Sequence, residues 1–134
     1  MRKTQGGLGP MELHRAGEDY LKAILILQKQ NHAVRSLDVA EMLRVTRPSV
    51  SRAMKLLREG GFLTMDADKR ISLTEAGQEA AELVFEKHRI LTECLVTMGV
   101  DPGIAEKDAC RMEHLISAET LEQMKNYVGR EVAV

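Results

Sequence analysis

Three side chains that can bind a metal ion lie close together in the last third of the sequence. If this segment is helical, Cys110, Glu113 and His114 are three and four residues apart, so a thiol, a carboxylate and an imidazole share one face. Glu106, one turn earlier, extends the same stripe. Three donor types at one point are costly in a core and suit a divalent transition metal. The pattern predicts a metal site on a helix from Ile104 to Ile116.

The composition is that of a globular protein with reduced thiols. The chain has 134 residues, enough for one domain or two small lobes, and 44% of them are hydrophobic. No apolar run approaches the ~20 residues that span a bilayer. Residues 1–10 lack the apolar core of a secretory signal, and we interpret them as a flexible leader. Two cysteines make no disulfide framework. We therefore expect a cytoplasmic protein that does not bind membranes.

Charge is distributed unevenly along the chain. From Arg44 to Arg70 there are seven Lys or Arg residues against three Asp or Glu. From Ile71 to Val134 the balance reverses, with six basic and twelve acidic residues. A basic middle followed by an acidic C-terminal half suggests two functions in one chain, the first of them contact with nucleic acid.

Two helices with a tight turn after the second are predicted before the basic region. Apolar periodicity predicts the first over Glu18–Gln30 and a short second one over Leu37–Leu43, with Ser36 as its N-cap. Arg44 then occupies a turn position where glycine is common. We expect an unusual backbone angle at this arginine.

A third helix and a β-hairpin complete the pattern of a winged helix-turn-helix. Thr46 can cap the third helix, Pro48 is tolerated only in its first turn, and Gly60-Gly61 would end it. Two short extended runs, 62–65 and 71–73, flank a charged turn and predict the wing. This arrangement favours binding to double-stranded DNA.

The winged helix-turn-helix assigns roles to the basic and polar side chains. The start of the third helix would enter the major groove, where Arg can donate hydrogen bonds to guanine and Pro48 can contact a thymine methyl. Lys55 and the wing cations would contact phosphates. The competing interpretation is a solvated basic face. The residues expected at DNA are Thr46, Arg47, Pro48, Ser49, Ser51, Arg52, Lys55, Lys69 and Arg70.

The acidic half is predicted to be helical throughout. Thr74 can cap a long helix that runs to about Met98 and carries His88 within its apolar stripe. A last helix begins at Ser117 or Ala118 and runs to about Val128, followed by a loose tail. We predict a mainly α protein with a leader over 1–10, a winged helix-turn-helix domain over 11–73, and a helical metal-binding and dimerisation domain over 74–134.

Four stretches taken together resemble the diphtheria-toxin-repressor family of metal-dependent transcriptional repressors. The stretches are Glu18-Asp19-Tyr20-Leu21, the wing, Lys87-His88-Arg89 and Asp108-Ala109-Cys110-Arg111-Met112-Glu113-His114. The resemblance covers about residues 12–128 and includes both iron-dependent regulators and manganese transport regulators. It implies a short form of the family without the SH3-like domain.

The resemblance implies a ligand set that combines two branches of the family. By position, the metal ligands fall on Asp19, His88, Cys110, Glu113 and His114. Asp19 matches the manganese branch, whereas Cys110 matches the iron branch. Lys22 stands where manganese regulators hold a second carboxylate, which argues against a two-metal cluster of that type. Glu106 lies near a ligand of the iron branch's ancillary site, where Thr92 replaces a carboxylate and Glu93 is one residue away, so a second site with His88 remains an alternative.

The donor types favour some metals over others. A thiolate disfavours Mn²⁺, whereas thiolate, imidazole and carboxylate together suit Fe²⁺, Co²⁺, Ni²⁺ or Zn²⁺. We expect Fe²⁺, with Mn²⁺ as the alternative. The competing interpretation of Cys110 is a small buried hydrophobic residue.

We predict a metal-dependent repressor of metal-homeostasis genes that binds a palindromic operator as a homodimer, with no enzymatic activity and no organic substrate. Apolar surface for the dimer would come from Leu95, Met98, Ile104, Leu115, Ile116, Leu121 and Met124. The alternatives are a manganese-responsive regulator of the same family, and a winged-helix regulator that senses an oxidant or organic ligand through Cys110 or Cys94. A small metalloenzyme ranks behind these, because no acid–base pair or nucleophile stands out.

Overall fold

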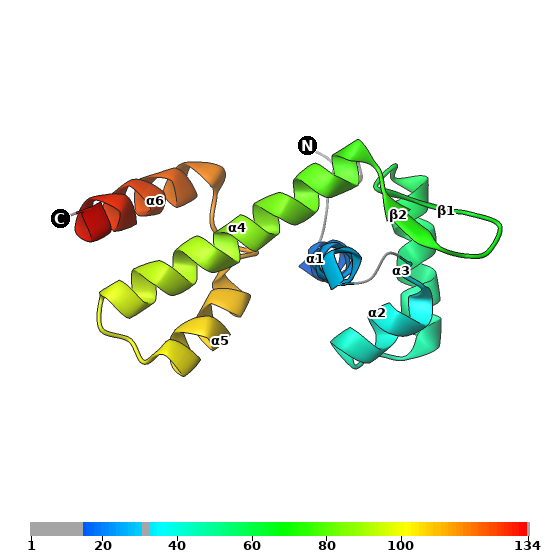
Figure 1. Ribbon diagram of the computed structural model, residues 1–134, viewed down its shortest axis with the longest axis horizontal. Coiled ribbons are helices and arrows are strands. Elements are labelled where there is room, and N and C mark those ends of the chain that lie inside the picture. The colour runs from blue at the N-terminus through cyan, green and yellow to red at the C-terminus, as the bar shows by residue number, and fades with distance from the viewer. Residues whose placement is uncertain (1–14, 31–32, 134) are drawn as a thin grey trace, which may run out of the picture. The chain divides into compact units, whose positions relative to one another are not determined.

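The structure is a computed structural model, and it describes residues 15–30 and 33–133 (Figure 1). The leader predicted over residues 1–10 lies outside these ranges. The described chain is mainly helical, with one two-stranded sheet, which confirms the predicted fold class. It divides into two compact units after Glu82. No helix in the described ranges is long and apolar enough to cross a membrane.

The described residues form six helices and two strands, in the order expected for a winged helix-turn-helix and a helical domain. They are α1 (Arg15–Gln30), α2 (Ser36–Leu43), α3 (Arg47–Glu59), β1 (Leu63–Met65), β2 (Ile71–Leu73), α4 (Glu75–Thr97), α5 (Pro102–Met112) and α6 (Ala118–Ala133).

The turn between α2 and α3 has the backbone geometry predicted for it. Arg44 adopts the left-handed conformation, with φ 56° and ψ 47°. The prediction of Ser36 as N-cap of α2 was wrong, because Ser36 is already helical and Arg35 is the N-cap. Asp38, in the first turn, accepts a hydrogen bond of 2.8 Å from the backbone N–H of Arg35. This carboxylate satisfies a donor at the helix start and favours the earlier beginning.

Helix α3 begins and ends at the residues that the sequence indicated. The Thr46 hydroxyl accepts the backbone N–H of Ser49 at 3.3 Å and donates to the Ser49 hydroxyl at 2.8 Å. Pro48 occupies the first turn. Gly60 is the C-cap, and Gly61 follows with φ 85°, a conformation that glycine adopts without a steric penalty.

Strands β1 and β2 form the predicted antiparallel wing. Leu63 pairs with Leu73, and Met65 pairs with Ile71. In the turn between the strands, the Asp66 carboxylate accepts the backbone N–H groups of Asp68 and Arg70 at 2.8 and 2.9 Å. These two bonds order the wing tip without a glycine.

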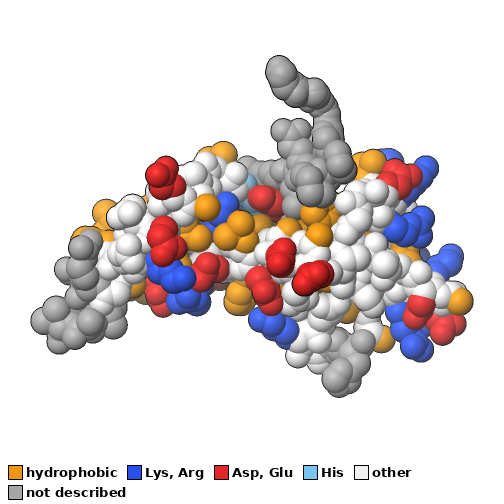
Figure 2. Space-filling model, turned by 90° about the horizontal axis from the view of Figure 1, so that it is seen from above, with side chains coloured by type: hydrophobic (Ala, Val, Ile, Leu, Met, Phe, Trp, Pro, Cys, Tyr) orange, Lys and Arg blue, Asp and Glu red, His pale blue; other side chains and the backbone are white. Residues whose placement is uncertain are grey.

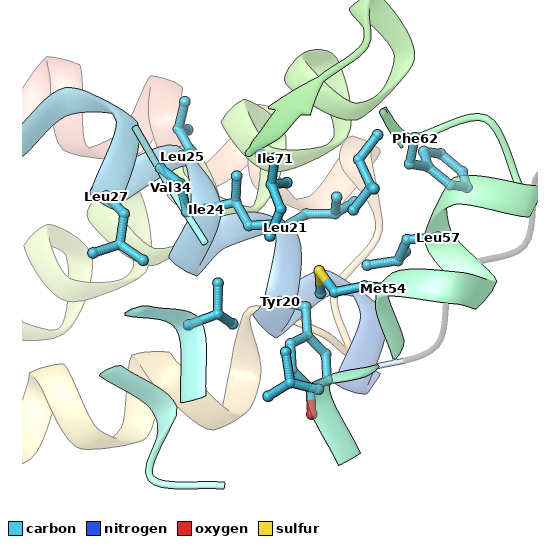
Figure 3. Packing of buried hydrophobic residues seen from close by; sticks show 14 of the residues in the cluster. Tyr20, Leu21, Ile24, Leu25, Leu27, Val34, Met54, Leu57, Phe62 and Ile71 are labelled. Carbon is cyan, nitrogen blue, oxygen red and sulfur yellow. The ribbon is translucent and has the colours of Figure 1, made fainter. Parts of the chain in front are cut away.

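The first unit has a continuous apolar core. Figure 3 shows side chains of α1, among them Leu21 and Ile24, directed toward Met54 and Leu57 of α3 and toward Ile71 of β2. Leu21 and Ile24 are completely buried. Because α1 packs on α2, α3 and β2, it is the helix that supports the helix-turn-helix.

Helix α4 begins as predicted and runs to Thr97. The Thr74 hydroxyl accepts the N–H of Gly77 at 3.1 Å and donates to the carbonyl of Gly61 at 2.6 Å. Along the part of α4 that lies in the second unit, the buried side chains are Val84, Lys87, Ile90, Leu91 and Cys94.

Helix α5 differs from its prediction at both ends. It begins earlier, at Pro102, because the Asp101 carboxylate caps it by accepting the N–H groups of Gly103 and Ile104. It ends at Met112, not Ile116. After Met112 the hydrogen-bond spacing changes, because the N–H of Leu115 bonds the carbonyl of Met112 at 2.9 Å. This three-residue spacing is tighter than that of an α-helix and ends it.

Helix α6 is longer than expected. The predicted loose tail after Val128 was wrong, because the helix continues to Ala133. Ser117 stands before the helix, and its hydroxyl accepts the N–H of Thr120 at 3.1 Å. An ion pair of 3.1 Å between Lys125 and Glu86 joins α6 to α4.

Candidate metal centre and nucleic-acid surface

Two residues from different helices form the centre of the candidate site. His88 projects from α4, and Glu113 caps the C-terminus of α5. Nδ1 of His88 lies 2.9 Å from Oε1 of Glu113. The Glu113 side chain is 1% exposed, and that of His88 is 20% exposed. A carboxylate this deeply buried requires polar partners, and the imidazole supplies one.

The Cys110 thiol joins this pair. One ligand atom from each of His88, Cys110 and Glu113 lies within 4.8 Å of the other two. Cys110 and Glu113 are three residues apart, and the N–H of Glu113 still bonds the carbonyl of Ala109, so helical spacing holds between them. Cys110 is exposed, which contradicts the interpretation as a buried hydrophobic residue.

His114 approaches the site from the other side of Glu113. Its Nε2 lies 3.4 Å from Oε2 of Glu113, and its side chain is 2% exposed. The prediction that Cys110, Glu113 and His114 share one helical face was therefore wrong for His114. The helix ends at Met112, so His114 belongs to a turn and not to the face of α5. The Glu113 carboxylate lies between two imidazoles, one from α4 and one from this turn.

The other predicted ligands are placed as follows. Asp19 lies on α1 in the first unit and is half-buried. Glu106 is exposed on α5, and among the described residues it belongs to no cluster of metal-binding side chains. Glu93 forms an exposed ion pair with Arg89 at 3.4 Å, and the Thr92 hydroxyl donates to the carbonyl of His88.

The donors brought together in the helical unit fit a divalent transition metal. A thiolate, an imidazole and a carboxylate are each competent ligands, and their ligand atoms are close enough for one ion to contact all three. The second carboxylate oxygen of Glu113 is instead close to the imidazole of His114, at 3.4 Å.

One further residue, Lys87, was assigned no role from the sequence, and it directly precedes the candidate ligand His88 on α4. Lys87 is buried, and its Nζ donates a hydrogen bond of 3.1 Å to the carbonyl of Ile116. The available signal was its position, because it precedes His88 on the face of α4 that also carries Val84 and Leu91.

Helix α3 and the wing carry exposed basic side chains. Arg47, Pro48, Ser51, Arg52 and Lys55 are exposed, as are Lys69 and Arg70 on the wing, whereas the hydroxyls of Thr46 and Ser49 bond each other. Figure 2 shows Lys and Arg side chains, with some Asp and Glu among them, on the surface of the winged helix. Lys69 has φ 64°, which sharpens the wing tip.

A winged helix with an exposed basic helix α3, followed by a helical unit in which a thiol, an imidazole and a carboxylate lie close together, is typical of one class of protein. It is the class of metal-responsive DNA-binding regulators. Two family models divide the chain in the same order. Residues 12–71 match the iron dependent repressor N-terminal DNA binding domain, and residues 74–131 match the iron dependent repressor metal binding and dimerisation domain.

Known proteins are similar over most of the chain. The transcriptional regulator MntR of Escherichia coli is 33% identical over 124 residues, which are 91% of this chain and 80% of that protein. The diphtheria toxin repressor of Corynebacterium diphtheriae is 32% identical over 76% of this chain and 46% of its own length. A manganese-dependent transcriptional repressor solved in complex with manganese has 27% identity and a TM-score of 0.76, over 84% of this chain and 52% of that one.

The chain belongs to the iron-dependent repressor family, the metal-dependent transcriptional repressors that include the diphtheria toxin repressor and MntR. The resemblance noted from the sequence is thus confirmed. The chain spans about half the length of the diphtheria toxin repressor and of the manganese-bound repressor.

Proposed function

We propose that this protein represses metal-homeostasis genes in response to Fe²⁺, by binding a palindromic operator as a homodimer. The observation that carries the choice of metal is the cluster of His88, Cys110 and Glu113. A thiolate is a poor ligand for Mn²⁺ and a good one for Fe²⁺ and the later divalent metals. The exposed position of Cys110 leaves its sulfur accessible to an incoming ion.

Five residues are proposed as the ligands: Asp19, His88, Cys110, Glu113 and His114. Four of them belong to the helical unit, and Asp19 is included on the strength of the family resemblance and its position on α1. When bound, a divalent ion would join the donors of the helical unit to the carboxylate of Asp19. Glu106 is not proposed, because its exposed carboxylate lies outside the cluster.

The coupling to DNA follows from where Asp19 lies. Helix α1 supports α3 through the core that contains Leu21 and Met54. Holding α1 against the helical units of a dimer would favour one orientation of the two recognition helices, matched to successive major grooves. The metal can shift the equilibrium between orientations only by the difference between its binding free energies for them.

The homodimer is proposed from apolar side chains that one chain leaves in water. Met98, Ile104 and Leu115, all in the second unit, are more than half exposed. Burial of such side chains between copies removes apolar area from water. Leu121, also expected at the dimer surface, is instead buried within the chain, so it contributes to the core.

Because the proposed target of the protein is DNA, we propose that the protein acts in the cytoplasm.

A manganese-responsive regulator is the alternative, and two similar proteins favour it. One is the manganese regulator SloR, and the other is the manganese-dependent transcriptional repressor solved in complex with manganese. Asp19, the residue that matches the manganese branch, is consistent with either metal.

DNA binding under anaerobic conditions tests the proposal. Operator fragments would be selected from random DNA with Fe²⁺ present, and their affinity then measured with Fe²⁺, with Mn²⁺, and with a chelator. We expect tight binding with Fe²⁺ and weak binding with the chelator. Equal binding with and without metal would refute the metal-dependent mechanism, and tighter binding with Mn²⁺ than with Fe²⁺ would favour the alternative.

A further inference from the structure

Lys87 is an unusual residue in the helical unit because a lysine is seldom so deeply buried. Its side chain is 9% exposed, and the hydrogen bond from Nζ to the carbonyl of Ile116 is 3.1 Å long. Removing an ammonium group from water is unfavourable unless strong partners replace the lost hydration. A methionine has nearly the same length and would fill the space without that penalty. The lysine therefore serves a purpose other than packing.

The partner of Lys87 lies at one end of the segment that carries two of the proposed ligands. The turn between α5 and α6 consists of Glu113, His114, Leu115 and Ile116. At its start, the Glu113 carboxylate contacts His88 at 2.9 Å. At its end, the Ile116 carbonyl accepts the Lys87 ammonium. Two consecutive residues of α4 therefore hold both ends of this turn.

Local backbone bonds hold part of this turn, and the two attachments to α4 hold its ends. The N–H of Leu115 bonds the carbonyl of Met112, and the next helix is capped only from Ser117 onward. The Leu115 side chain is 81% exposed, so it contributes little packing that would fix the segment. The bond from Lys87 therefore restrains the backbone two residues after His114.

We propose that Lys87 is a positioning residue for the metal centre, which acts by fixing the Glu113–Ile116 turn so that His114 and Glu113 are presented together. This inference rests on the proposed function, since it requires that both residues bind the metal. Residues outside the ligand set that orient ligands commonly change metal affinity by 10- to 100-fold when they are replaced.

Cobalt(II) is a suitable probe, because a thiolate–Co²⁺ bond absorbs in the near ultraviolet and reports both binding and the ligation of Cys110. The dissociation constant would be measured for the full chain by competition with a chelator, alongside the melting temperature of the metal-free protein. We expect Lys87→Met to weaken Co²⁺ binding by roughly 10- to 100-fold. Lys87→Arg keeps a cationic donor and is expected to bind Co²⁺ more tightly than Lys87→Met.

The matched control is Lys125→Met. Lys125 is also in the helical unit and also bonds through Nζ, but its partner is the half-buried Glu86 of α4 and not the turn. A surface ion pair contributes little, so this variant is expected to bind Co²⁺ within about twofold of the wild type. The control separates the position of Lys87 from the general effect of removing one lysine.

The inference would be overturned if Lys87→Met bound Co²⁺ within twofold of the wild type. This holds for any change in melting temperature, because a purely structural lysine changes only the melting temperature. If Lys87→Met does not fold, Lys87→Ala leaves space for water at the Ile116 carbonyl and is judged by the same criterion. Failure of the wild-type chain to bind Co²⁺ would instead overturn the proposed function.

Discussion

The Glu113 carboxylate and the His88 imidazole lie 2.9 Å apart, although 25 residues separate them in the chain. The second oxygen of the same carboxylate lies 3.4 Å from Nε2 of His114. One buried carboxylate thus joins the long helix α4 to the turn that follows α5. One ligand atom each from Glu113, His88 and Cys110 lies within 4.8 Å of the other two, a spacing that one cation could share.

Replacing Glu113 by glutamine tests this arrangement with little change in shape. Glu113→Gln removes the charge, and we expect the affinity for Fe²⁺ or Co²⁺ to fall by more than about tenfold, because an amide is a weak ligand for these ions. Isothermal titration under anaerobic conditions measures the change. Glu106→Gln is the control, since Glu106 is exposed on α5 outside the cluster. A loss of similar size in Glu106→Gln would contradict the ligand assignment and favour an ancillary site.

Cys110 is expected to set the choice of metal. Cys110→Asp replaces a soft sulfur by a hard oxygen, so we expect the ratio of Mn²⁺ to Fe²⁺ affinity to rise by about an order of magnitude. Chelator competition with each ion measures the ratio. Cys94→Ala is the matched control, because Cys94 is the other free thiol and is buried in the described structure. An unchanged ratio in Cys110→Asp would show that this sulfur does not select the metal.

The cations of α3 are expected to differ in which part of the DNA they contact. Arg52→Ala should weaken operator binding by about 1–3 kcal/mol and relax the preference for one base pair. Lys55→Ala should weaken binding to all sequences and reduce the slope of log affinity against log salt concentration by about one. Competition titrations with operator variants at several salt concentrations measure both. Arg58→Ala removes the same charge from the other end of α3, where Arg58 contacts Met65, and is expected to leave sequence preference unchanged.

The left-handed turn before α3 carries a measurable backbone strain. Arg44 has φ 56°, a region that disfavours residues with a Cβ by about 1–2 kcal/mol. Arg44→Gly is therefore expected to be more stable than Arg44→Ala by about 1 kcal/mol in urea denaturation. Both variants lose the same exposed side chain, so the comparison isolates the backbone. Equal stability would indicate that the turn relaxes in one of the variants.

Gly77 is expected to be irreplaceable where α4 begins. A Cβ at this buried position would clash with the carbonyl oxygen of Phe62, so Gly77→Ala must displace backbone. We expect a loss of about 1–3 kcal/mol, measured by thermal denaturation. Gly129→Ala on α6 is the control, because a Cβ there meets nothing within 4 Å, and it is expected to stabilise the helix by about 0.5–1 kcal/mol.

The winged helix-turn-helix could be predicted because its signals are local. A cap residue, a proline in the first turn and two glycines mark both ends of α3, and each acts within a few residues. The unusual conformation of Arg44 followed from the same reasoning. The start of α2 was misplaced by one position, because the Asp38 carboxylate satisfies the N–H of Arg35 and extends the helix backward.

The sequence by itself determined the donor types and the pairing of Cys110 with Glu113, because helical spacing persists from the carbonyl of Ala109 to the N–H of Glu113. Only the tertiary structure decided that His88 joins them while His114 approaches from a turn, because α5 ends at Met112. The same packing buries Lys87 against Ile116. Periodicity describes one helix at a time, whereas contacts between α4 and the turn after α5 depend on how side chains pack between elements.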